Sequence, residues 1–261
     1  MKSGLKIGVL AVQGAFIEHK RMLESLGCEC VELRRKSDIC DLDGFVLPGG
    51  ESTVQGKLLR ELDMFDELKE RIANGLPVLA TCAGLILLAS HISNDDNVYF
   101  GTLPVTVKRN AYGRQLGSFE ATARFDNSFE FTMTFIRAPY VEAIDDSAKN
   151  DVHVLAEYDS KIVGVQYKNQ IGLAFHPELN DDTRIHERFF VSVVEKGRPH
   201  IVVGGLDKAR HDDEQADDLR QPRDEGDCRF QKALQQVGDV LVQVIQGRHA
   251  LATAQASRLL I

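Results

Sequence analysis

The sequence lacks the features of several classes of protein. No stretch approaches the roughly 18 consecutive apolar residues of a membrane-spanning helix, and we therefore expect no membrane partner. Basic residues are not in excess: 31 Lys and Arg against 39 Asp and Glu give a net charge of −8, which argues against nucleic acid as a partner. The five cysteines are odd in number and scattered, which favours a reducing cytoplasm over a disulfide framework.

The first residues are not interpreted as a signal peptide. The segment MKSGLKIGVLAVQG has a basic start and a short apolar run, but it lacks a convincing cleavage region and continues into Gln13-Gly14. We interpret this run as a first buried strand. The full length of 261 residues is enough for one sizeable α/β domain or two small ones.

Apolar strands alternate with helical patterns in the first part of the chain. The expected strands are 6–12, 28–33, 43–50 and 76–82, and the expected helices are 15–26, 53–73 and 83–92. This alternation is typical of βαβ units and predicts an α/β protein with a largely parallel sheet.

From about residue 98 the pattern changes to short strands with few helices between them. The expected strands are 102–109, 118–125, 130–136, 152–158, 161–167 and 171–178, and a final helix is expected over 181–194. Consecutive short strands separated by Asn, Asp and Gly predict antiparallel ribbons that join the same sheet.

The C-terminal segment differs in composition from the rest. Its only aromatic residue is Phe230, and its middle is a run of mixed charge. Such a segment has little with which to build a core. We therefore divide the chain into a main domain, 1–195, and a C-terminal extension of unknown role, 196–261, which we expect to be partly disordered.

Cys82 stands where an apolar strand is expected to turn directly into a helix, in VLATCAGLILLA (78–89). Such a turn holds a side chain clear of the backbone and is crowded, so it needs small neighbours, here Ala80, Ala83 and Gly84. The free N–H groups and positive dipole end of the helix favour a thiolate over a thiol. A lone cysteine in an apolar run is most often a core residue. The elbow position makes Cys82 a candidate nucleophile.

A candidate base lies at the end of a later strand. The segment IGLAFHPEL (171–179) contains His176, and a histidine at the end of a parallel strand can reach the end of the neighbouring strand, where Cys82 is expected. Glu178 can accept a hydrogen bond from the imidazole and set its tautomer. The three residues therefore form a candidate triad of nucleophile, base and orienting group.

The segment LPGGES (47–52) is a third element. Two glycines after a strand let the backbone approach a ligand and present N–H groups. Such a loop, through Gly49, can supply one half of an oxyanion hole, and the N–H of Ala83 can supply the other. A Pro-Gly-Gly sequence alone is usually only a turn, and its combination with Cys82 and His176 favours the functional interpretation.

These residues resemble the triad glutamine amidotransferases of class I and, more narrowly, the glutaminase subunits of pyridoxal 5′-phosphate synthase. The matching stretches, in the expected order, are 7–19, 47–53, 81–89, 109–120, 135–140 and 174–179. The resemblance covers residues 1 to about 195 and does not extend into the C-terminal extension. It implies the three-layer, flavodoxin-like class I fold, with a central, mostly parallel sheet and antiparallel additions.

The resemblance also implies roles for individual residues. Cys82 would be the nucleophile, His176 the general base and acid, and Glu178 its orienting partner. The residues implied to hold glutamine are Gly50, Glu51, Ser52, Arg109, Ile136 and Arg137. Gln13 is associated with completing the oxyanion site when the synthase docks. One departure is Ala80, where the elbow commonly has glycine.

The implied activity is hydrolysis of L-glutamine to glutamate and ammonia through a cysteinyl thioester. Ammonia would pass through a protected channel to a separate synthase subunit that assembles pyridoxal 5′-phosphate, within a large hetero-oligomer. The resemblance implies that the protein itself needs no metal and no cofactor.

Two alternatives remain open. The first is the glutaminase of another pathway, such as histidine biosynthesis, although the segment RNAYGRQ (109–115) favours the vitamin B6 pathway. The second is a non-catalytic binding or regulatory subunit. The intact Cys82, His176 and Glu178 argue against it, but a C-terminal extension that blocks the partner surface would have the same result. Four other histidines are interpreted as surface or satisfied side chains: His19, His91, His153 and His186.

Overall fold

The computed structural model describes residues 4–111 and 117–196, and within these ranges twelve strands form one sheet. The strands are β1 (Lys6–Leu10), β2 (Glu29–Leu33), β3 (Gly44–Leu47), β4 (Val78–Thr81), β5 (Ala89–Ile92), β6 (Leu103–Lys108), β7 (Ser118–Phe125), β8 (Phe129–Ile136), β9 (Tyr140–Ile144), β10 (Val152–Tyr158), β11 (Lys161–Tyr167) and β12 (Gln170–Leu173). The helices are α1 (Phe16–Ser25), α2 (Ser52–Glu61), α3 (Phe65–Ala73), α4 (Ala83–Leu88) and α5 (Arg184–Lys196), with short 3₁₀ turns η1 (Lys36–Asp38), η2 (Asp146–Ala148) and η3 (Pro177–Leu179).

The sheet has a parallel half and an antiparallel half. Its order is β2-β1-β3-β4-β12-β11-β10-β7-β8, and the pairs from β2 to β12 are parallel while those from β12 onward are antiparallel. Strands β5, β6 and β9 join beside β11, through the pair β9–β11. The predicted α/β architecture, a central parallel sheet with antiparallel additions, is confirmed.

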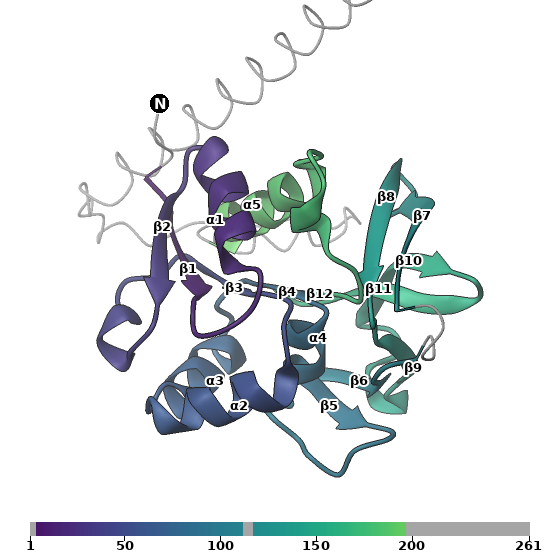
Figure 1. Ribbon diagram of the computed structural model, residues 1–261, viewed down its shortest axis with the longest axis horizontal. Helices are drawn as coiled ribbons and strands as arrows, with labels where there is room; N and C mark the ends of the chain where they lie inside the picture. Colours follow the sequence, from purple (N-terminus) through teal and green to yellow (C-terminus); the bar gives the residue numbers. More distant parts are fainter. Residues whose placement is uncertain (1–3, 112–116, 197–261) are drawn as a thin grey trace, which may run out of the picture. The chain divides into compact units, whose positions relative to one another are not determined.

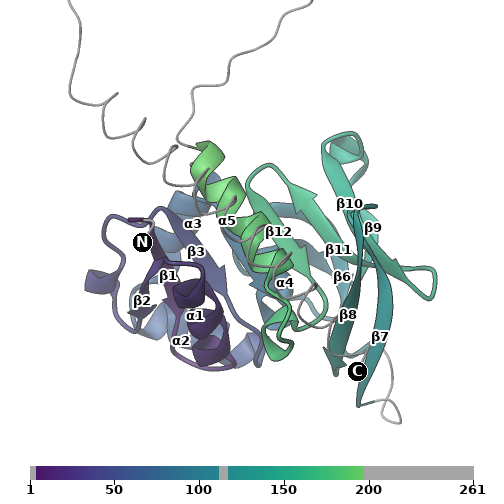
Figure 2. The ribbon, with the colours of Figure 1, turned by 90° about the horizontal axis from the view of Figure 1, so that it is seen from above.

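Helices cover both faces of the parallel half. In Figure 1 the sheet is seen close to edge-on, with α1 and α5 on one side and α2, α3 and α4 on the other. Figure 2 shows the antiparallel strands β7, β8 and β10 gathered at the end of the sheet away from β2. Every residue of β3, β4 and β12 is buried, as expected for parallel strands covered on both faces. Apart from Gly4, the described residues belong to one compact unit.

The prediction of one continuous helix over 53–73 is wrong, because two separate helices, α2 and α3, occupy this range. The break lies at Asp63, which has a left-handed φ of 55°. The N–H of Met64 donates to the carbonyl of Leu59 across the turn. Met64 and Phe65 are thereby buried in the core, and their burial stabilises a turn that the apolar periodicity does not reveal.

The predicted helix 83–92 is also wrong in its second half. Helix α4 ends at Leu88 and the chain continues directly into β5, which pairs in parallel with β6. A continuous apolar run does not distinguish a buried helix from a buried strand. Strand β9 is absent from the sequence-based prediction because its burial pattern lacks clear alternation.

Some predictions fall on residues that the structure does not describe. The C-terminal extension lies outside the described residues from residue 197 onward, and so do residues 112–116 of the matching stretch 109–120. Among the described residues, none of the helices is long and apolar enough to cross a membrane.

Candidate active site

Cys82 occupies the sharp turn between β4 and α4, as the sequence predicts. Its φ of 47° is left-handed, a conformation that costs energy in a residue other than glycine and often marks a functional site. Its N–H donates to the carbonyl of Leu173 at 2.8 Å, which ties the elbow to β12. The side chain is 7% exposed.

Small residues beside the elbow are required by close packing. A Cβ on Gly84 would lie 2.9 Å from Cβ of Leu47 and still closer to its carbonyl oxygen. Ala80 is in register with Gly172 on β12, and side chains in register on parallel strands share a face. Ala80 is 0% exposed, so its methyl group is packed within the core beside the elbow.

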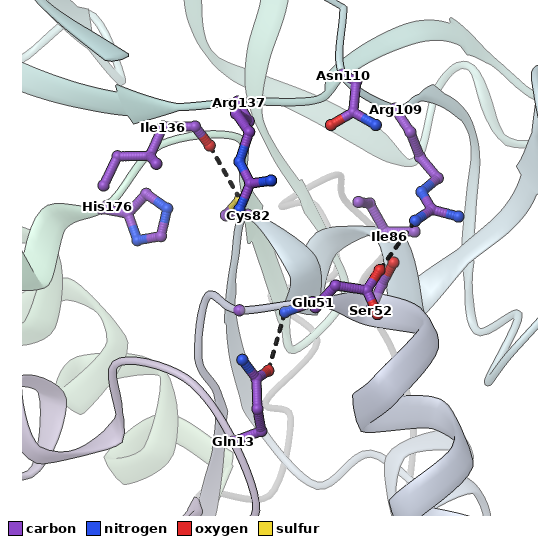
Figure 3. Close-up of a pocket in the computed structure, with 11 residues that line it drawn as sticks. Gln13, Glu51, Ser52, Cys82, Ile86, Arg109, Asn110, Ile136, Arg137 and His176 are labelled. Carbon is purple, nitrogen blue, oxygen red and sulfur yellow. Dashed lines mark hydrogen bonds and ion pairs between the residues drawn. The ribbon is translucent and has the colours of Figure 1, made fainter. Parts of the chain in front are cut away.

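His176 and Glu178 follow β12, which lies beside β4 with Leu173 in register with Thr81. The carboxyl ends of the two strands therefore coincide, and His176 and Cys82 line the same cavity (Figure 3). Nδ1 of His176 lies 2.7 Å from Oε1 of Glu178, and both side chains are buried. Among the described residues Nε2 of His176 has no hydrogen-bond partner. The imidazole is thus held at one nitrogen and available at the other.

The loop 47–52 lies against this histidine. A Cβ on Gly49 would lie 2.7 Å from Nδ1 of His176 and closer still to Cε1, so the ring occupies the space that a side chain would fill. The carbonyl of Gly49 accepts the N–H of Ala15 at 3.1 Å. Oε1 of Gln13 accepts the N–H of Glu51 at 2.9 Å. The segment that precedes α1 therefore holds the loop in place.

All six residues predicted to hold substrate line a single cavity of about 260 Å³. Its lining residues are Gln13, Gly50, Glu51, Ser52, Cys82, Ile86, Arg109, Asn110, Ile136, Arg137 and His176. Gly49 and Ala83 do not belong to the lining, although Gly49 abuts His176 and Ala83 directly follows Cys82. Sequence reasoning missed Ile86 and Asn110. Ile86 lies one helical turn after Cys82, and Asn110 directly follows Arg109. These short distances in sequence from predicted site residues could have indicated both.

The two arginines of the cavity differ in their surroundings. Arg109 forms ion pairs with Glu51, at 3.1 Å, and with Asp95, as Figure 3 shows for Glu51. Arg137 is exposed, has a φ of 44° and makes no ion pair with any residue that the structure describes. Ser52 is 2% exposed, and its hydroxyl has no hydrogen-bond partner within the described ranges. Arg137 and Ser52 thus offer donors that this part of the protein leaves unused.

His19 and His186 are both 0% exposed, so of the two predicted alternatives, surface or satisfied, the surface one is excluded for this pair. Nδ1 of His19 is hydrogen-bonded to Nε2 of His186 at 2.9 Å, and Nε2 of His19 to the hydroxyl of Thr81 at 3.1 Å. Nδ1 of His186 lacks a partner among the described residues. No motif marks this pair, because it forms only when α1 and α5 pack on the same face of the sheet.

The charges of the site depend on one another. Burial lowers the pKa of His176, but the nearby Cys82 and the hydrogen-bonded, negatively charged Glu178 outweigh burial and raise it to about 10. Burial acts to raise the pKa of Glu178, but His19 and His176 outweigh it and hold that pKa below its usual range. At neutral pH the site therefore contains an imidazolium on His176 and a carboxylate on Glu178.

Glu178→Gln is expected to lower the titration midpoint of His176 from about 10 toward the ordinary value of 6.5, because the amide removes the negative charge. A raised pKa means that the wild-type contribution to stability is full below about pH 6.5 and is lost as the pH rises through about 10. NMR of protein with labelled histidine rings measures the midpoint. The signals of the exposed His91 and His153 serve as controls that the substitution leaves unchanged. An unmoved His176 midpoint would contradict this account.

The profile of the SNO glutamine amidotransferase family matches residues 9–196, well over half of the chain. The chain belongs to the SNO glutamine amidotransferase family. The cavity with Cys82 and His176 lies within the matched residues, so it is the candidate active site of an SNO family member.

Named relatives agree with membership of the SNO glutamine amidotransferase family. "Pyridoxal 5′-phosphate synthase subunit PdxT" of Desulfitobacterium hafniense (strain DSM 10664 / DCB-2) is 62% identical over 190 residues, which are 72% of this chain and 94% of the relative. The protein of the same name from Methanocorpusculum labreanum is 52% identical over 186 residues, 71% of this chain and 96% of the relative.

A solved structure, described as a glutamine amidotransferase, is 40% identical with a TM-score of 0.67. The match covers 72% of this chain and 98% of that chain. The SNO family member described above therefore has the class I glutamine amidotransferase fold, as the resemblance implied.

Proposed function

We propose that this chain is the glutaminase subunit of a pyridoxal 5′-phosphate synthase. It hydrolyses L-glutamine to glutamate and ammonia and delivers the ammonia to a separate synthase subunit for vitamin B6 biosynthesis. The observation that carries the proposal is the common cavity of Cys82, at a strand–helix elbow, and His176, held by Glu178. The names of the relatives support the pathway, and they give no support to histidine biosynthesis.

In the first half of the proposed reaction, the Cys82 thiolate attacks the carboxamide carbon of glutamine and a C–S bond forms. The imidazolium of His176 favours the thiolate before attack. Its proton then passes to the amide nitrogen, the C–N bond breaks, and ammonia leaves. Glu178 stabilises the imidazolium through the 2.7 Å contact with Nδ1, which leaves Nε2 for this transfer.

In the second half, water hydrolyses the thioester. Neutral His176 accepts a proton from the water as its oxygen bonds to the acyl carbon. The C–S bond then breaks, and glutamate and the Cys82 thiolate are released with His176 protonated again. The cycle is balanced with one glutamine and one water consumed, and it uses no metal or cofactor.

The oxyanion of both tetrahedral intermediates requires N–H donors. We propose that the backbone N–H groups of Gly49 and Ala83 supply them, because one residue lies against His176 and the other follows Cys82 at the start of α4. Gln13, which bonds to the N–H of Glu51, is proposed to complete this site when the synthase docks.

We propose that the rest of the cavity holds the amino-acid end of glutamine. An arginine can bond both oxygens of a carboxylate, and Arg109 and Arg137 both line the cavity. Ion pairs with Glu51 and Asp95 hold Arg109 in one orientation. The other proposed contacts are Gly50, Glu51, Ser52 and Ile136, among which the unpartnered Ser52 hydroxyl offers a hydrogen bond.

The test is the release of glutamate from L-glutamine by the full chain, with and without a pyridoxal 5′-phosphate synthase partner subunit. We expect strong stimulation by the partner, because we propose that docking completes the oxyanion site. The same measurement on a chain that ends at residue 196 tests the proposed division into a domain, 1–195, and an extension, 196–261.

The outcomes separate the hypotheses. Stimulation of both chains supports the proposed function and an extension that does not block the partner. Stimulation of the shortened chain alone indicates that the extension blocks the partner surface. If neither chain releases glutamate with the partner present, the proposed function is wrong and a non-catalytic role is favoured.

A further inference from the structure

A buried pair of histidines lies behind the candidate active site, on the side of Glu178 away from His176. His19 is on α1 and His186 on α5, and the two helices lie next to each other on one face of the sheet in both Figure 1 and Figure 2. Both rings are 0% exposed, and a 2.9 Å hydrogen bond joins them. The mechanism proposed above does not use them.

The pair reaches Glu178 directly. Nε2 of His19 lies 3.2 Å from Oε2 of Glu178 and 3.1 Å from the hydroxyl of Thr81. The other carboxylate oxygen, Oε1, is the one bonded to His176. Within the described ranges Oε2 accepts no hydrogen bond of good geometry. His19 is therefore the ionisable group next to the oxygen of Glu178 that His176 leaves free.

The charge of Glu178 decides the tautomer of His19. If Nε2 carried a lone pair, it would face a carboxylate oxygen at 3.2 Å, which is repulsive. A proton on Nε2 instead directs the positive end of an N–H dipole at Thr81 and Glu178. Nδ1 of His19 then accepts a hydrogen bond from Nε2 of His186, and Nδ1 of His186 is left as an unpartnered acceptor. An unpartnered acceptor is less costly than an unpartnered buried donor.

We propose that His19 is a positioning residue for the active site. Its Nε2–H, which is shared with the Thr81 hydroxyl, attracts the negative charge on Oε2 of Glu178 at 3.2 Å. This attraction keeps Oε1 on Nδ1 of His176, and His186 fixes the tautomer of His19. The inference rests on the proposed function, since the pair that His19 positions is the one assigned to the chemistry on Cys82. The proposal adds His19 and His186 to the candidate triad of Cys82, His176 and Glu178, so that these five side chains form one row.

The electrostatics agree with this geometry. Burial lowers the pKa of His19, with Glu178 and Glu18 acting in the opposite direction and His176 in the same one. Burial also lowers the pKa of His186 well below its usual range, helped by His19. Both rings are therefore neutral at neutral pH, and each carries one N–H. Nε2–H of His186 donates to Nδ1 of His19, and Nε2–H of His19 faces Thr81 and Glu178.

Two substitutions at residue 19 separate positioning from packing. His19→Gln keeps a side-chain N–H near the position of Nε2, facing Glu178, whereas His19→Asn keeps a polar group near Nδ1, facing His186, and withdraws from Glu178. Both side chains are smaller than histidine, and Asn leaves the larger void, so the His176 midpoint is measured beside kcat to separate positioning from packing. Kinetics of glutamate release are measured on the full chain with the synthase partner subunit, and the His176 titration is measured by NMR on the chain alone.

We expect His19→Asn to lower kcat roughly 10- to 100-fold, the size of loss seen when a polar contact to a buried charged group is removed. KM for L-glutamine should be unchanged, because His19 does not line the cavity. The titration midpoint of His176 should fall in the same variant, because Glu178 is less firmly held against it. His19→Gln should retain most of the wild-type kcat and the wild-type midpoint.

Three results would overturn the proposal: equal loss of kcat in the two variants, unchanged kcat in His19→Asn, or a His176 midpoint that moves in neither variant. If the wild-type chain releases no glutamate, the proposed function fails. In that case the His176 titration midpoints of the two variants, measured by NMR on the chain alone, still decide whether His19 positions Glu178.

A measurement on the wild-type chain keeps the inference testable if either variant does not fold. Nitrogen NMR of ring-labelled histidines distinguishes the two neutral tautomers. We expect the neutral tautomer with the proton on Nε2 for both His19 and His186. A proton on Nδ1 of His19 would leave nothing to hold Oε2 of Glu178 and would refute the proposal.

Discussion

Cys82→Ala is expected to yield a folded protein without measurable glutaminase activity. In the proposed mechanism the sulfur of Cys82 bonds to the acyl carbon, and no other cysteine of the described residues lines the cavity. Removal of a nucleophile lowers kcat by roughly 10⁴-fold or more in enzymes of this type. The fold is expected to persist because only one sulfur atom is removed and the backbone bond from residue 82 to Leu173 is kept.

Cys40→Ala is the matched control for this prediction. It is the same chemical change at an exposed cysteine outside the cavity. Glutamate release with the synthase partner, together with circular dichroism of each variant, compares the two proteins at equal folded concentration. Turnover by Cys82→Ala near that of Cys40→Ala would mean that Cys82 is not the nucleophile.

Gly49→Ala is expected to lower kcat by roughly 100-fold or more, although the added methyl group is outside the cavity lining. The new Cβ would lie 2.7 Å from Nδ1 of His176 and nearer to Cε1, so the ring or the loop must move. Displacement of a reacting group by about 1 Å costs a hundredfold in rate. Movement of the loop would also shift the proposed Gly49 donor of the oxyanion hole, and the loss of one such donor has an effect of similar size.

Gly117→Ala provides the comparison for Gly49→Ala. A Cβ at Gly117 would have no heavy atom of the described residues within 4 Å, chain neighbours aside, so this variant undergoes the same loss of backbone freedom without a collision of that kind. Steady-state kinetics give kcat for both variants, and the NMR signal of His176 reports whether its ring has moved. Equal kcat values in the two variants would refute the close packing of Gly49 on His176.

The sequence predicted the residues of the candidate site that depend on local pattern. An apolar strand that turns into a helix at Cys82, and a strand that ends at His176, are visible because parallel strands present their carboxyl ends at one edge. The Pro-Gly-Gly turn is visible for a similar reason. Other site residues were predicted only through the family resemblance, because no local pattern distinguishes them from solvated polar residues. These are Arg109, Arg137 and Gln13.

The parts that the sequence did not predict depend on contacts between distant segments. The break at Asp63 lies within an unbroken apolar periodicity, and only the burial of Met64 and Phe65 explains it. The ion pair between Asp95 and Arg109, like the pair of His19 and His186, joins residues from different elements. Such pairs form through tertiary packing, and a single sequence carries no signal for them.

The position of β12 has a consequence for how the protein is made. Among the described strands it is the last to be synthesised, yet it lies between β4 and β11 in the sheet. A nascent chain that has not reached residue 170 therefore presents two unpaired edges, and such edges bind other chains. The strand that closes this gap also brings His176 to Cys82. Translation that stops early is thus expected to leave an aggregating chain, and not a weakly active enzyme.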